Sequence, residues 1–159
     1  MALKGDRHEF ETTIDYFMNE VAERGGIATM STAGSGAAQD QSAALVTYAA
    51  GPSGLVPVGV LLNDMVNNDQ TRTRINFHKN EMQQGGKVTL LKKGFVVTNW
   101  IDPGVTIAGG EPAYVGPSGY VSNNNALGGR IVGDWGGLAD EDGYAKLNVN
   151  LPQFDNNQA

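Results

Sequence analysis

The segment that decides the fold is DGYAKLNVNL, residues 142–151. It opens with Asp142-Gly143, a pair of residues typical of tight turns between strands. Apolar side chains then occupy every second position from Ala145 to Leu151, with polar side chains between them. Alternation with a period of two places one face of a strand in the core and the other face in water. We therefore expect a half-buried β-strand that follows a hairpin turn.

Short apolar segments separated by turn residues precede this strand along the chain. The expected strands cover residues 44–49, 56–62, 87–91, 95–100, 113–115, 120–122 and 130–134. The two segments on either side of Lys92-Lys93-Gly94 predict a hairpin. Short strands at close spacing are typical of all-β sandwiches and barrels. The sequence therefore predicts one all-β domain, either a small sandwich or a small barrel.

The composition agrees with a turn-rich β protein and excludes several classes. Glycine accounts for 22 of 159 residues, about twice the average usage of ~7%. Charged residues make up 18%, and the formal net charge is −6. A negative chain is not expected to bind nucleic acid, because phosphate repels it. No apolar run approaches the ~18 residues of a membrane span, so we expect no membrane partner.

The first 42 residues predict a separate N-terminal arm. Five apolar residues recur at helical spacing and predict an amphipathic helix over 13–24: Phe10, Ile14, Phe17, Met18 and Val21. Gly25-Gly26 is a natural helix end, and the small, polar residues 27–42 predict a linker. An amphipathic helix of this kind either docks on another protein or packs on its own domain. We expect a β domain over 43–152, with an insertion at 63–86 and a disordered tail at 153–159.

Basic residues gather in one part of the chain. Six of the eleven fall between positions 72 and 93: Arg72, Arg74, Lys79, Lys87, Lys92 and Lys93. Only Glu81 opposes them there. The cluster predicts either an electropositive contact patch for an acidic partner surface or a solvated loop face.

The chain carries little that could perform chemistry. His8 and His78 are its two histidines, it has no cysteine, and it has no nucleophile elbow or phosphate-binding loop. The acidic cluster Asp140-Glu141-Asp142 lacks the distal glutamate of a calcium loop, so a solvated turn is the favoured interpretation. We therefore expect no enzyme activity, no catalytic residues, no metal and no cofactor.

The order of the β segments resembles the capsid decoration, or cement, proteins of tailed bacteriophages. The segments that carry the resemblance are PVGVLLND (57–64), GGKVTLLKKGFVVTN (85–99), AGGEPAYVGPSGYVS (108–122), LGGRIVGDW (127–135) and DGYAKLNVNLP (142–152). They follow the order of that family: a Val-Gly-Val strand, a long Gly-flanked segment, an Ala-Gly segment with a Gly turn, a Gly-Arg strand and a closing strand. The resemblance extends over roughly residues 45–152, about two-thirds of the chain.

The resemblance implies a β-barrel or β-tulip fold and a structural role in the virion. It implies a subunit, often trimeric, that binds the major capsid protein on the outer capsid surface and stabilises the head. The acidic N-terminal segment and the 63–86 insertion depart from the simplest family members. The alternative is another virion surface component, such as a head fibre base, a tail component or a glycan-binding module using Tyr114, Tyr120 and Trp135.

Overall fold

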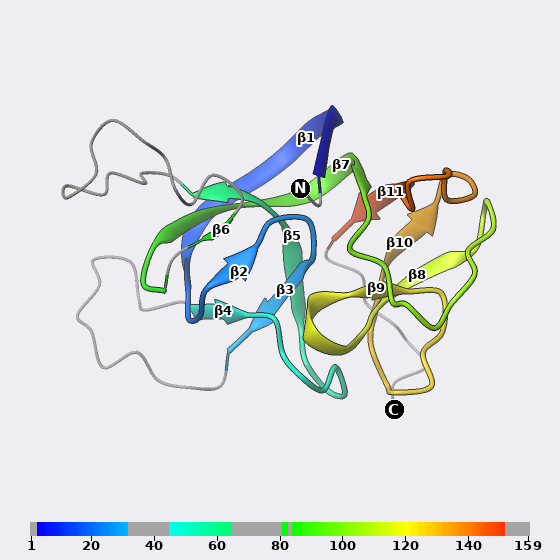
Figure 1. Ribbon diagram of the computed structural model, residues 1–159. Helices are drawn as coiled ribbons and strands as arrows, with labels where there is room; N and C mark the ends of the chain where they lie inside the picture. Colours follow the sequence, from blue (N-terminus) through cyan, green and yellow to red (C-terminus); the bar gives the residue numbers. More distant parts are fainter. Residues whose placement is uncertain (1–2, 32–44, 65–80, 83, 152–159) are drawn as a thin grey trace.

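The computed structural model describes residues 3–31, 45–64, 81–82 and 84–151 (Figure 1). Within these ranges the chain forms eleven β-strands and one short 3₁₀ turn, η1 (Pro117–Gly119). The prediction of an all-β protein is confirmed. Among the described residues, no helix is long and apolar enough to cross a bilayer.

Nine of the strands join in one sheet, in the order β1-β4-β3-β5-β7-β11-β10-β8-β9. Strands β2 and β6 pair separately. The bounds are β1 (Leu3–Met18), β2 (Ala22–Glu23), β3 (Ile27–Met30), β4 (Leu45–Thr47), β5 (Pro57–Asp64), β6 (Glu81–Met82), β7 (Lys87–Thr98), β8 (Pro112–Val115), β9 (Val121–Ser122), β10 (Ile131–Trp135) and β11 (Ala145–Asn150).

Strand β7 is the central strand of the sheet, because it pairs with β1, β5 and β11. One of its edges pairs with β1 from Lys87 to Thr98. Its other edge is shared, because β5 pairs with residues up to Leu91 and β11 pairs from Lys93 onward. Since β1 also pairs with β4, strands β1, β4, β3, β5 and β7 form a closed circuit of pairings. Strands β11, β10, β8 and β9 extend from the second half of β7, as Figure 1 shows.

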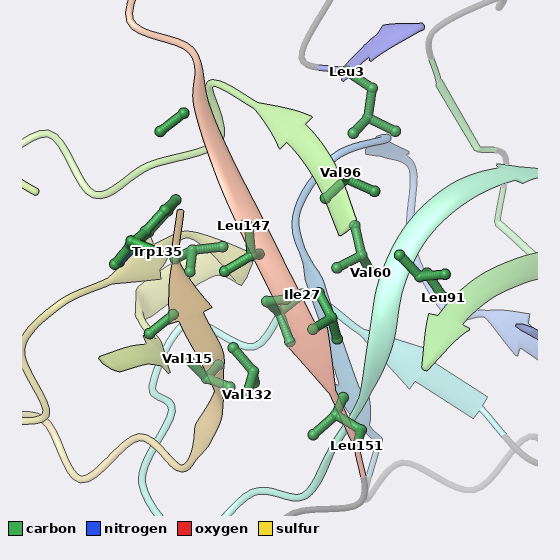
Figure 2. Close-up of a cluster of buried hydrophobic side chains, with 14 of the residues drawn as sticks. Leu3, Ile27, Val60, Leu91, Val96, Val115, Val132, Trp135, Leu147 and Leu151 are labelled. Carbon is green, nitrogen blue, oxygen red and sulfur yellow. The ribbon is translucent and has the colours of Figure 1, made fainter. Parts of the chain in front are cut away.

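Two clusters of buried side chains lie on opposite faces of β5. Val60 and Leu62 belong to the larger cluster, which Figure 2 shows with Trp135 and Leu147. Leu61 belongs to the smaller cluster, with side chains from β1, β3, β4 and β7. Strands that are buried on both faces read as continuous apolar runs rather than alternating ones. This double burial explains the unbroken apolar run of residues 60–62.

The expected half-buried strand at the end of the domain is confirmed as β11. Ala145, Leu147, Val149 and Leu151 are each at most 4% exposed. The residues between them are exposed or half-buried. The turn before the strand uses Gly143, which has φ +82°. A positive φ of this size is accessible to glycine at little cost, which is why the Asp-Gly pair marks the turn.

The predicted N-terminal helix is wrong, because residues 3–18 form strand β1. Its residues include Thr12, Thr13, Ile14, Tyr16 and Phe17, and such β-branched and aromatic types favour strands. Helical spacing over a short segment cannot outweigh an available edge, and β7 supplies one. Residues 3–18 and 27–30 therefore belong to the nine-stranded sheet, as β1 and β3, rather than to a helical arm with a linker.

The predicted hairpin at Lys92-Lys93-Gly94 is also wrong. Strand β7 runs through these residues without turning. Gly94 has φ +138° and lies opposite an irregularity in β1, where Glu9 pairs with Gly94 and Glu11 with Lys93. A glycine that signals a turn in sequence can instead mark a β-bulge in a long strand. Residues 32–42 of the predicted linker, most of the 63–86 insertion (65–80 and 83) and the tail at 153–159 lie outside the described residues.

Candidate docking surface on the first strand

Strand β1 presents a long edge at the margin of the molecule, at the top of Figure 1. One edge of β1 pairs with β7 along its length, and the other pairs with β4 only at Phe17 and Met18. Among the residues that the structure describes, no strand pairs with that second edge between Leu3 and Tyr16. We call this segment the β1 edge. An unpaired edge offers main-chain N–H and C=O groups to a partner.

Apolar side chains stand exposed on and beside the β1 edge. Phe10 is 76% exposed and Ile14 is 40% exposed. Val21, just beyond the end of β1, is 56% exposed. These are three of the five residues that the sequence predicted for a docking surface, and they remain candidates for it.

The other two predicted residues are placed differently. Met18 is fully buried in the smaller core cluster, and Phe17 is half-buried with Lys87 Nζ 5.8 Å from the centre of its ring. The prediction of a single apolar stripe is therefore wrong. In an extended strand, neighbouring side chains point to opposite faces, so Phe17 and Met18 cannot both face outward with Ile14.

An aromatic side chain on β7 holds the first half of β1 against the sheet. The rings of His8 and Phe95 stack with their centres 6.2 Å apart. Lys146 Nζ lies 4.0 Å from the centre of the same Phe95 ring. A lysine above an aromatic face is attracted by the ring quadrupole. These contacts tie β1, β7 and β11 together on one face of the sheet.

An ion pair fixes the beginning of β1 to the turn before β11. Lys4 Nζ donates a hydrogen bond of 2.7 Å to Asp140 Oδ2 and lies 4.4 Å from the centre of the Tyr144 ring. The lysine lowers the pKa of the Asp140 carboxyl, and the N–H groups of Tyr144 and Asp142 lower it further. Asp140 in turn raises the pKa of Lys4. The predicted solvated turn is thus also an anchor for β1.

Asp140→Asn is expected to cost a small, pH-dependent part of the stability. Because the folded-state pKa of Asp140 is lowered, its contribution is present above the ordinary value of 3.8 and disappears as the pH falls through the folded value. Because the pKa of Lys4 is raised above its ordinary value of 10.5, the lysine stays charged and the ion pair stays intact at every pH below that value. Urea unfolding between about pH 2 and pH 8 measures the difference from wild type. Glu141→Gln is the matched control, and a loss that is equal at every pH would contradict the ion-pair explanation.

Two of the three described lysines of the predicted basic patch contact side chains of β1. Lys93 Nζ lies 3.6 Å from Glu11 Oε2, and Lys87 lies over Phe17. Lys92 lines a surface hollow together with Tyr16 and Met30. Arg72, Arg74 and Lys79 lie outside the described residues. The contact-patch prediction therefore stays a prediction for those three residues.

The acidic cluster and His8, which could in principle take part in catalysis or metal binding, make structural contacts instead. Asp140 accepts hydrogen bonds from the turn and from Lys4, and His8 stacks on Phe95. Within the described ranges, no group of three or more acidic or histidine side chains could hold a metal ion. Of the aromatics considered for glycan binding, Trp135 is 0% exposed, so its ring cannot stack on a sugar. Tyr120 stacks on Trp100 with ring centres 5.1 Å apart.

No local sequence pattern predicts the contacts that hold β1 in place. Phe95 and Lys146 lie 51 positions apart in the chain, and their neighbourhood follows from the pairing of β7 with β11. The stack of Tyr48, Trp100 and Tyr120 likewise joins three segments that are distant in sequence. Such contacts can be predicted only once the strand order is known.

A scan against models of protein families and a search of curated proteins both find no match for this chain. Function must therefore be inferred from the residues and their arrangement. The β1 edge combines main-chain groups, two exposed apolar side chains and a rigid base on β7. That combination suits binding to another protein surface.

Proposed function

We propose that this chain is a capsid decoration subunit of a tailed bacteriophage, which binds the major capsid protein on the outer surface of the head. The observation that carries the proposal is the β1 edge, with Phe10 and Ile14 exposed beside unpaired main chain. The order of the β segments, which resembles that family, gives the class of partner. The role is structural, without catalysis, metal or cofactor.

The closed circuit of β1, β4, β3, β5 and β7 is, in this proposal, the β-barrel or β-tulip of the family. A rigid sheet suits a protein that must hold neighbouring shell subunits in fixed positions. We further propose that three copies assemble as a trimer, because a trimer engages several shell subunits at once. Linked contacts of this kind raise the overall affinity well above that of one contact.

The β1 edge fits this role better than a helical arm would. Burying an exposed phenylalanine or isoleucine side chain contributes about 1.5–3 kcal/mol, and each 1.4 kcal/mol changes affinity tenfold. The rigid attachment of β1 to β7 means that little conformational entropy is lost on docking. Deleting the first 26 residues would remove β1 and part of the core, so point substitutions give the cleaner test.

Phe10→Ser combined with Ile14→Ser is expected to weaken binding to the shell at least about tenfold, because two apolar contacts are lost. Binding is measured by co-sedimentation with expanded empty heads that lack the protein. Wild-type protein is also expected to raise the temperature at which those heads break. Both substituted side chains are exposed, so the fold and its unfolding temperature should change little.

Leu127→Ser is the matched control, because Leu127 is 57% exposed but does not belong to β1. It should bind heads as wild type does. Equal binding by the double variant would exclude the β1 edge as the docking surface. Failure of folded wild-type protein to bind the heads at all would refute the decoration role itself.

A further inference from the structure

A second surface lies beside the turn at Asp140, to which Lys4 of β1 is bonded. It is a hollow of about 440 Å³ between the segment after β7 and the turn that joins β10 to β11. Residues from Asn99 to Ile107 form one wall, and Leu138, Ala139 and Gly143 form the other. We call it the 99–143 hollow. It uses none of the residues proposed for attachment to the shell.

The lining of the 99–143 hollow is largely apolar. Ile107 is 4% exposed and belongs to the larger core cluster, and Ile101 packs against that cluster. Val105 is half-buried on the same wall. Leu138 stands at the opposite wall and is 71% exposed. A single exposed leucine is ordinary, but here it flanks a hollow whose floor is the protein's own core.

Acidic side chains stand on both walls. Asp102 lines one wall, and its Oδ1 accepts a hydrogen bond from Gly104 N–H. Glu141 and Asp142 are exposed in the turn between the lining residues Ala139 and Gly143. Among the described residues, the ion pair recorded at this turn joins Lys4 to Asp140, which neutralises that carboxylate. Asp102, Glu141 and Asp142 therefore give the rim a negative field.

We propose that the 99–143 hollow binds an extended peptide segment of another protein, with an aliphatic side chain between basic residues. The aliphatic side chain lies against Ile101, Val105 and Leu138. Lysine or arginine side chains on either side lie beside Asp102, Glu141 and Asp142. Complementary charge around an apolar anchor is the usual pattern of a small protein–peptide contact.

The charge of the rim selects this occupant over two others. A second copy of the chain docked through the same hollow would bring a second acidic rim against the first, and like charges facing each other oppose association. Nucleic acid is repelled for the same reason. The inference goes beyond shell attachment through β1 and stands whether or not that attachment is confirmed.

The test uses the full-length, isotopically labelled protein and a capped pentapeptide, lysine–lysine–leucine–lysine–lysine. Amide shifts followed by NMR should move saturably at residues 99–107 and 138–143, with a dissociation constant near or below about 1 mM. Two control peptides replace the leucine with serine or the four lysines with glutamates. Each control peptide should bind at least about tenfold more weakly, because it loses the anchor or the charge attraction.

Two variants of the protein separate the parts of the site. Leu138→Ser should weaken binding of the pentapeptide by about threefold to tenfold, since an exposed leucine gains burial on binding. Glu141→Gln with Asp142→Asn should weaken binding mainly at low salt, because screening already reduces exposed charge contacts at high salt. Leu127→Ser, which removes an exposed leucine that does not line the hollow, should bind as wild type does.

Several results would overturn the proposal. These are the absence of saturable shifts, shifts confined to other residues, and equal binding of the serine or glutamate peptides. A concentration-dependent change at residues 99–107 and 138–143 without any peptide would also overturn it, because it would identify a second copy of the chain as the occupant. None of these results depends on empty heads, so failure here is distinguishable from failure of the decoration role.

Discussion

Trp135→Ala is expected to lower the free energy of unfolding by about 3–5 kcal/mol, because it empties a large space in the core. Trp135 ends β10 and is 0% exposed. It belongs to the larger cluster, and Figure 2 shows its ring beside Leu147 of β11. Strand β10 is held on both edges by its pairing with β11 and β8, so these strands can close only part of the cavity. A domain of ordinary stability has about 5–15 kcal/mol to lose.

Urea unfolding followed by circular dichroism measures this loss. Leu138→Ala is the matched control, because Leu138 lies three positions further along the chain and is 71% exposed. It should change the free energy of unfolding by less than about 0.5 kcal/mol. If Trp135→Ala does not fold, Trp135→Phe should fold with a smaller loss of stability. A loss below about 1 kcal/mol for Trp135→Ala would contradict the core position of the ring.

Gly94→Ala is expected to cost about 3 kcal/mol or more, because backbone strain and a steric clash add together. Gly94 has φ +138°, a backbone angle that residues with a Cβ atom rarely adopt. An added Cβ would overlap the backbone carbonyl of His8 and lie 3.2 Å from the backbone nitrogen of Phe10. Both obstacles are main-chain atoms of β1. Relief therefore requires β1 to move away from β7, which breaks hydrogen bonds between them.

Substitutions at two other glycines separate the contribution of backbone strain from that of the steric clash. Gly85 has φ +81° with open space around the Cβ position, so Gly85→Ala should show the strain alone, about 1–2 kcal/mol. Gly5 lies in β1 with open space and no positive φ, so Gly5→Ala should change stability by less than about 0.5 kcal/mol. Equal effects at Gly94 and Gly85 would show that β1 is not held closely against β7 at the bulge. Thermal and urea unfolding give the three values.

The Gly94 substitution also bears on the docking surface. Phe10 is the residue of β1 between the two positions that pair with Gly94 and Lys93. Displacing β1 there would move Phe10 as well, so Gly94→Ala should weaken binding to empty heads without changing any exposed apolar side chain. The Phe10 and Ile14 substitutions have the opposite profile, with a loss of binding and an intact fold. Comparing Gly94→Ala with the Phe10 and Ile14 substitutions shows how far binding depends on the position of β1 and how far on its exposed apolar side chains.

Local sequence signals succeeded where a strand's environment is simple. The alternation in 144–151 and the Asp-Gly pair before it predicted β11 and its turn, because one face of that strand is buried and the other is exposed. The expected strands at 113–115 and 120–122 correspond to β8 and β9, and η1 with the positive φ of Gly119 lies between them. In these places each residue's neighbours are set by the local chain.

The first strand shows why the rest could not be predicted. Phe10, Ile14 and Val21 belong to the predicted helical stripe, but the structure places them exposed on and beside a strand. The same apolar spacing fits a helix or a twisted, bulged strand, and the preference between them was set by the edge of β7, which is some 80 residues away. The 99–143 hollow has the same origin, since its two walls meet only because β11 pairs with β7 and β10 pairs with β11.

The sequence by itself determined that this chain is a turn-rich, all-β protein, because composition, alternation and turn residues act over short distances. Only the tertiary structure decided that β7 would be one long strand with β1 along one edge and two partners on the other. This arrangement of strands buries Met18, exposes Phe10 and brings Lys146 over Phe95. The physical reason is that strand pairing satisfies main-chain hydrogen bonds between distant segments, and no local pattern specifies which segments will meet.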